Sequence, residues 1–169
     1  MAMRLSLLFF AAGFVLLLFQ TTLPRLVPLG PYVPDLALVL CVYLGLNHPT
    51  VGAVVGTFLL GYSVDVFSSN VLGLNAFALS LVFITAYLSS RAIWVHSPLL
   101  SASVVFLASW VKGASLMLLW ATFLTMERFG IGSLHYLLVD AIMAAVLAPA
   151  LFWVLKRGQD YLEQVKMPE

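Results

Sequence analysis

The chain has 169 residues and is hydrophobic at 63% of its positions, with a mean hydropathy of +1.08. Soluble domains contain about 45–50% apolar residues, so 8 basic and 7 acidic side chains are too few to cover a water-soluble protein of this length. The net charge of +1 and the lack of basic runs give no indication of nucleic-acid binding. These properties predict a single membrane domain over residues 1–169.

The first apolar run covers residues 5–23 and follows Arg4. A basic residue before an apolar stretch is typical of a signal peptide. This stretch is long for one, however, and it ends in Gln20-Thr21-Thr22 without an A-x-A-like cleavage site. We therefore predict a retained transmembrane helix.

Five further apolar segments follow, and a helix needs about 20 residues to cross a hydrocarbon core of about 30 Å. The six predicted transmembrane helices have the approximate ranges 5–23, 34–46, 50–67, 74–90, 98–121 and 134–155. The second covers only about 20 Å, so it either begins nearer Leu29 or does not reach the full depth. Pro49 in the sequence NHPT favours a tight hairpin between the second and third helices.

All six spans are expected to be helical, because lipid offers no partners for free backbone N–H and C=O groups and the runs do not alternate as barrel strands do. With six crossings, both chain ends lie on one side of the membrane. More basic residues lie on the side of the termini than on the other side. The first side has Arg4, Arg91, Lys156, Arg157 and Lys166, and the second has Arg25 and Arg128. This asymmetry predicts that both termini are cytoplasmic.

Four ionisable residues fall within the predicted spans, where such residues are costly and are candidates for function. Asp35 and Asp65 lie near the predicted external ends of the second and third helices. They are either boundary residues within reach of water, or they brace the external loops or meet a partner. Lys112 and Asp140 lie deeper, and counting from the outer face places them within reach of each other. We predict a structural ion pair between them. A role in proton or substrate movement, and a Lys112 that snorkels or lines a cavity, are the alternatives.

Small residues give a packing signal, since they let membrane helices approach closely. Gly52 and Gly56 form a GxxxG motif, and Gly45 and Gly61 extend this surface along the predicted hairpin. The surface serves either packing within the chain or a homodimer contact. In the sixth segment, Pro149 is expected to kink the helix.

No catalytic or metal-binding motif is recognisable in the sequence. There is no G-x-S-x-G, H-E-x-x-H or Walker-type loop. The three histidines are expected on different sides of the membrane, and Cys41 is the single cysteine. We therefore predict no enzymatic activity, no metal and no cofactor.

A pattern of motifs runs from residue 30 to 90. It begins with Pro34-Asp35 at the start of the second helix. A glycine-spaced third helix follows and leads to an Asp, a Ser and a Gly, and the next helix starts at Asn75-Ala76. The residues of the third helix and its turn are Gly52, Gly56, Gly61, Asp65, Ser68 and Gly73. With this pattern the stretch resembles the MreD family of bacterial rod-shape-determining membrane proteins. The chain departs from the family at Ser69, where a glycine is frequent.

The resemblance implies a scaffold in the cell-elongation machinery of the bacterial inner membrane. Such a scaffold would bind the bitopic protein MreC. Through MreC or directly, it would associate with MreB filaments, the RodA glycosyltransferase and a class B penicillin-binding transpeptidase. It would take part in organising peptidoglycan synthesis and rod shape. Pro34, Asp35, Asp65, Ser68, Gly73 and Asn75 are then candidates for partner contact or for structuring the loops.

The resemblance also implies a fold similar to the six-helix substrate-binding components of energy-coupling-factor vitamin transporters. A substrate-binding subunit of that kind is therefore the alternative function. It would need convergent polar groups in a pocket open to the outside. The sequence offers few candidates for such a pocket, among them Asp35, Asp65 and Asn75.

Overall fold

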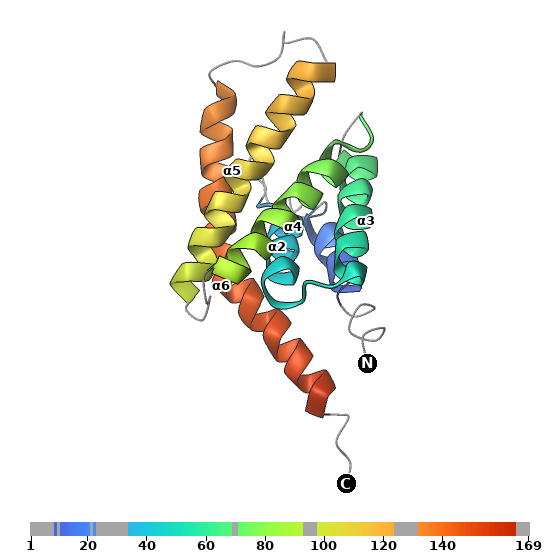
Figure 1. The fold of residues 1–169 in the computed structure, drawn as a ribbon, viewed down its shortest axis with the longest axis vertical. Coiled ribbons are helices and arrows are strands. Elements are labelled where there is room, and N and C mark those ends of the chain that lie inside the picture. The colour runs from blue at the N-terminus through green and yellow to red at the C-terminus, as the bar shows by residue number, and fades with distance from the viewer. Residues whose placement is uncertain are drawn as a thin grey trace.

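The computed structural model describes residues 9, 11–20, 22, 34–68, 71–92, 98–123 and 132–164. Within these stretches the chain forms six helices. The first is represented by Ala11–Gln20. The others are α2 (Leu36–Asn47), α3 (Val51–Ser68), α4 (Leu74–Ala92), α5 (Pro98–Phe123) and α6 (Gly132–Gln164). The expected all-helical architecture is confirmed for the described residues, and Figure 1 shows the helices gathered in one bundle.

Three of these helices are long and apolar enough to cross a membrane. Their apolar windows are Leu74–Arg91, Leu99–Leu119 and Leu138–Gln159. The first helix, α2 and α3 are apolar but shorter. Helices satisfy their own backbone hydrogen bonds, which lipid cannot do, so these segments define a multi-pass membrane protein.

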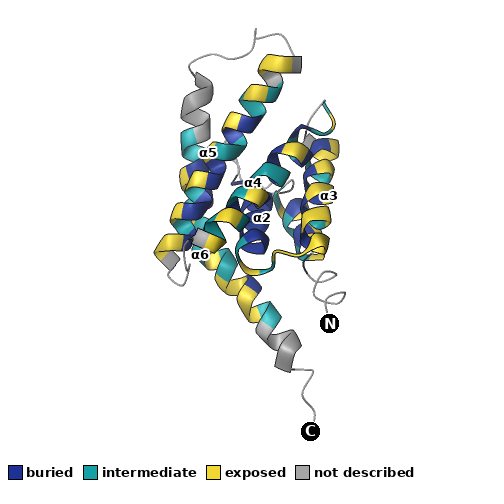
Figure 2. Cartoon of the chain, viewed as in Figure 1, coloured by how far each residue is buried: buried dark blue, intermediate teal, exposed yellow. Residues whose placement is uncertain are grey.

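Helix α2 forms the centre of the bundle. Every residue from Leu36 to Gly45 is buried, and α2 packs against α3, α4, α5 and α6, so that it lies dark blue among its neighbours in Figure 2. With 12 residues it is about 18 Å long. It therefore does not reach across a hydrocarbon core of about 30 Å. The helix itself begins at Leu36, and the alternative start nearer Leu29 falls outside the described residues.

Two glycines allow helices to approach α4 closely. A Cβ atom on Gly61 of α3 would lie 2.6 Å from the Cα of Ala76, and one on Gly45 of α2 would lie 2.8 Å from the Cβ of Ala86. Contacts this short leave no room for any side chain at either position. The packing role predicted for Gly45 and Gly61 is thus visible in the structure as contact with α4.

The GxxxG motif of α3 faces away from the bundle. Gly52 is exposed, and a Cβ atom on Gly56 would meet no atom within 4 Å. Large apolar side chains surround the two glycines along the same helix, including Val51, Val55, Phe58 and Leu59. Figure 2 shows this outer side of α3 largely in the exposed colour. Packing of Gly52 and Gly56 within the chain is therefore not observed, and we call this surface the open face of α3.

The two ends of the described chain lie at one end of the bundle. The ring of Phe9 contacts Tyr43 and His48 near the end of α2, with centroids 5.9 and 5.2 Å apart. The hydroxyl of Tyr43 and the imidazole of His48 each bond to the Gln159 side chain of α6. Figure 1 likewise shows the blue first helix beginning, and the red α6 ending, at the same end.

Helix α6 continues beyond its predicted end at residue 155. It has 33 residues and is about 50 Å long, so its C-terminal part projects from the bundle (Figure 1). The reason is that the polar sequence after Leu155 contains good helix formers and no proline before Met167. Pro149 lies inside the helix, and the two halves of α6 run in different directions in Figure 1, as expected for a proline kink.

Candidate functional site

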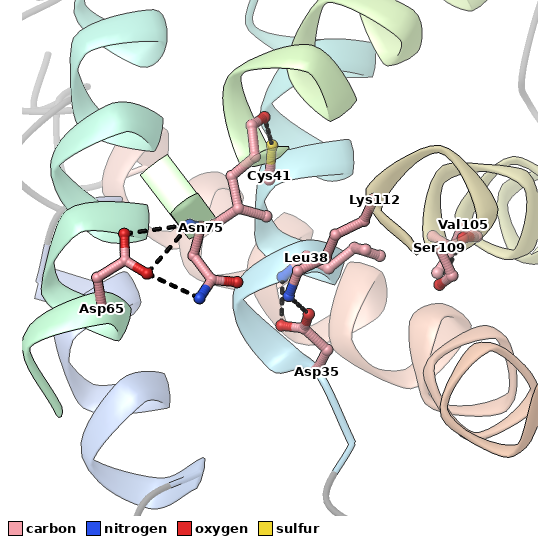
Figure 3. A network of polar contacts seen from close by, with 9 residues as sticks. Asp35, Leu38, Cys41, Asp65, Asn75, Val105, Ser109 and Lys112 are labelled. Atoms are coloured by element: carbon pink, nitrogen blue, oxygen red, sulfur yellow. Dashed lines mark hydrogen bonds and ion pairs between the residues drawn. The ribbon is translucent and has the colours of Figure 1, made fainter. Parts of the chain in front are cut away.

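The turn between α3 and α4 is organised by one buried carboxylate, that of Asp65. Asp65 has an exposed fraction of 0%. It accepts hydrogen bonds from the backbone amides of Gly73, Asn75 and Ala76 at 2.9 to 3.2 Å. The side-chain amide of Asn75 donates a further bond at 2.8 Å, and Figure 3 shows the Asp65–Asn75 contacts.

The position of Asp65 explains how a buried carboxylate is tolerated there. Its donors belong to the first turn of α4 and the residue before it, where backbone N–H groups have no partner within the helix. The positive end of the helix dipole also favours a negative charge at this point. Asp65, which belongs to the preceding helix α3, therefore caps the N-terminus of α4.

The chain reaches this geometry through a backbone bend at Gly73. Its φ of +97° is the one left-handed value in the described residues, a conformation that side chains other than glycine's rarely adopt. The sequence analysis gave Asp65, Gly73 and Asn75 as candidates for structuring the loops, and in the structure these three residues form the turn. Ser68, a further candidate, is the last residue of α3. Its side chain and the whole of Ser69 lie outside the described residues.

A second polar cluster lies at the start of α2. Asp35 is the N-cap of that helix, and its Oδ1 accepts a bond from the Leu38 amide at 3.0 Å. Its Oδ2 forms an ion pair with the Nζ of Lys112 on α5. Both side chains are largely buried, and Figure 3 shows them pointing toward each other. Pro34 precedes them and is also buried, its carbonyl accepting a bond from the Leu36 amide at 3.0 Å.

The predicted ion pair between Lys112 and Asp140 is therefore corrected, because the ammonium pairs with Asp35. The prediction placed Asp35 near the external end of the second helix and Lys112 deeper. In the structure Asp35 is the N-cap of α2, and this end of α2 lies beside Lys112 in the middle of α5. Asp140 is still close enough to interact electrostatically with both Asp35 and Lys112. Asp35, Lys112 and Asp140 together form what we call the buried charge cluster.

One polar contact was missed at the opposite end of α2. Gln159 accepts a bond from the Tyr43 hydroxyl at 3.2 Å and lies 2.9 Å from Nε2 of His48. The predicted sixth helix ended at residue 155, so a contact between Gln159 and the end of α2 was not expected. An extended helical pattern through Gln164 was the signal that could have revealed it.

Nothing in the described part of the chain assembles into a metal site, since no group of three His, Cys, Asp or Glu side chains converges there. Cys41 is buried in α2 and donates to the carbonyl of Leu79 at 3.2 Å. The polar side chains of Asp35, Asp65, Asn75 and Lys112 are instead bonded to one another or to helix backbone.

These features define the class of protein as a multi-pass helical membrane protein whose buried polar groups brace its own helices. A comparison with protein families identifies it further. The profile described as rod shape-determining protein MreD matches residues 1–157, and the chain therefore belongs to the MreD family. No curated protein and no solved structure matches the chain.

Membership of this family confirms the resemblance found in the sequence and extends it from residues 30–90 to most of the chain. The protein is accordingly a non-enzymatic membrane protein with a role in determining rod shape, associated with the machinery of cell shape.

Proposed function

We propose that the protein is an inner-membrane scaffold of the cell-elongation complex and that it binds MreC. The observation that carries this proposal is the contrast between the polar interior of the bundle and the apolar outer face of α3. Asp65, Asn75, Asp35 and Lys112 are bonded inside the bundle, whereas the open face of α3 presents apolar side chains around two small residues. A protein with this surface can work through contact with other membrane segments.

The open face of α3 is the proposed contact for the membrane helix of MreC. Helices associate in lipid through close packing at small residues rather than through the hydrophobic effect. Gly52 and Gly56 supply such a position, and among the described residues no atom would lie within 4 Å of a Cβ on Gly56. MreB, RodA and a class B penicillin-binding transpeptidase would then associate through MreC, or directly with other surfaces.

The proposed orientation places both termini in the cytoplasm of a bacterial cell. It is supported by the common position of the described chain ends and by the distribution of basic residues. Fusions of a cytoplasmic reporter and a periplasmic reporter to each terminus test it. Activity of the periplasmic reporter at either end contradicts the orientation.

The contact with MreC is tested by Gly56→Leu, which fills the open face without touching the rest of the bundle. Cysteines placed on this face should form disulfide cross-links with the MreC membrane helix, and Gly56→Leu should reduce co-purification of MreC at least tenfold. Ala121→Leu on an exposed position of α5 is the matched control. Unchanged MreC recovery from Gly56→Leu refutes this contact, and a cross-link to a second copy of the chain assigns the face to a homodimer.

The cellular role is tested by depletion in a rod-shaped bacterium. Cells that become round support the scaffold, and cells that keep their shape but lose vitamin uptake support the transporter alternative. The structure supplies no specific observation for that alternative. Asp65 and Asn75 bind each other, and Asp35 binds Lys112, so these candidates for a substrate pocket are already engaged.

A further inference from the structure

The buried charge cluster holds two carboxyl groups and one ammonium group. They come from three separate parts of the chain: Asp35 from the cap of α2, Lys112 from α5 and Asp140 from α6. Lys112 is about 21 Å from the start of α5 and about 17 Å from its end, so the cluster lies deep within the bundle. If all three groups were ionised, the cluster would carry a net charge of −1.

The two carboxyl groups differ in their partners. Asp35 has the Lys112 ammonium on one oxygen and the Leu38 amide on the other. The Asp140 carboxyl lies beside the backbone amide of Asp35, but its Oδ1 is shielded from solvent and has no hydrogen-bond partner. The single ammonium of the cluster is therefore committed to Asp35, and Asp140 is left without a counter-ion of its own.

Asp65 shows what an ionised buried carboxylate requires in this same protein. Four N–H donors surround its two oxygens. Asp140 is only partly buried and has the backbone amide of Asp35 as a donor, but its buried Oδ1 has no partner. A carboxylate with an unpaired buried oxygen, next to the negative charge of Asp35, is disfavoured inside a membrane. A neutral carboxylic acid at this position removes the unpaired charge.

We propose that Asp140 binds a proton, so that the buried charge cluster is a neutral arrangement of one ion pair and one carboxylic acid. The proton is on Asp140 because Asp35 is held ionised by direct contact with Lys112. Among the side chains that the structure describes, the charged or titratable groups that interact with Asp140 are Asp35 and Lys112, and Cys41 of α2 is close to both of them. This inference is independent of the proposed contact with MreC.

Infrared spectroscopy of the full-length protein in lipid nanodiscs tests the proposal. The wild type should show the C=O stretching band of a protonated carboxyl group at neutral pH, and Asp140→Asn should lose it. Lys112→Gln leaves Asp35 without its counter-ion, so it should double this band. Absence of the band in the wild type, or its persistence in Asp140→Asn, overturns the proposal.

Stability provides a second measurement that does not depend on the infrared band. An unfolded Asp is ionised near neutral pH, so a folded state that holds an extra proton loses stability as the pH rises. The stability of the wild type relative to Asp140→Asn should therefore fall as the pH rises from about 4 to neutral, because the unfolded chain gives up this proton at about pH 4 and the folded protein keeps it. A wild type whose stability rises with sodium or potassium concentration, or an Asp140→Asn protein that is unstable at every pH, refutes the bound proton.

Discussion

The cap formed by Asp65 gives the sharpest prediction about stability. Asp65→Asn preserves the shape of the side chain but replaces one acceptor oxygen with an NH₂ group that faces backbone N–H donors. The amides of Gly73 and Ala76 bond to Oδ2, and the side chain of Asn75 bonds to Oδ1. Whichever oxygen is replaced, at least one buried donor loses its acceptor.

The expected loss follows from these contacts. A hydrogen bond to a charged group contributes about 1.5–3 kcal/mol, and a carboxylate at a helix N-terminus contributes up to about 2 kcal/mol when partly buried. We therefore expect Asp65→Asn to lower the free energy of unfolding by about 3–5 kcal/mol, as measured by steric trapping or SDS titration in mixed micelles.

The matched control for this experiment is Asn75→Ala. It removes one side-chain donor but leaves the carboxylate and its backbone bonds in place, so a loss of only about 1 kcal/mol is expected. An Asp65→Asn protein within 0.5 kcal/mol of the wild type would show that the cap does not hold the turn and would refute the reasoning.

Two further predictions concern the packing of α3 and the buried ion pair. Gly61→Ala should destabilise the protein by about 2 kcal/mol through overpacking, because the new Cβ would lie 2.6 Å from the backbone of Ala76. A Cβ on Gly158 would meet no atom within 4 Å, so Gly158→Ala should stabilise the protein by about 0.5–1 kcal/mol. Equal effects of Gly61→Ala and Gly158→Ala on the unfolding midpoint would contradict this account. Lys112→Met should cost about 3–5 kcal/mol because it leaves Asp35 buried without its partner. Adding Asp35→Asn should restore at least half of that loss, and a double variant no more stable than Lys112→Met argues against the pair.

Local features of the chain were predictable because they depend on short-range chemistry. The apolar runs gave helix bounds close to those observed from α2 to α5, and a carboxylate close to a glycine-containing turn indicated a capped connection. Gly45 and Gly61 were expected to pack, although their contact with α4 was not specified. These features follow from residue type and spacing within one or two adjacent helices.

Depth within the membrane was the quantity that the sequence did not determine. The partner of Lys112 was assigned by counting residues inward from the outer face, and the same reasoning placed Asp35 near the external end of its helix. In the structure Asp35, at the N-cap of α2, is the partner of Lys112. The contact between Gln159 and the end of α2 was missed for a related reason, since it depends on how far α6 extends.

The shortness of α2 has a consequence for the order in which the protein is assembled. Helix α2 has 12 residues and is buried by its neighbours, so contact with lipid alone stabilises it little. Its N-cap Asp35 has its counter-ion, Lys112, on α5. Its Tyr43 bonds to Gln159 on α6. Both of these helices leave the ribosome later. The central helix must therefore reach its final place after its surroundings have been synthesised, and a chain truncated before α5 should be cleared by membrane proteases.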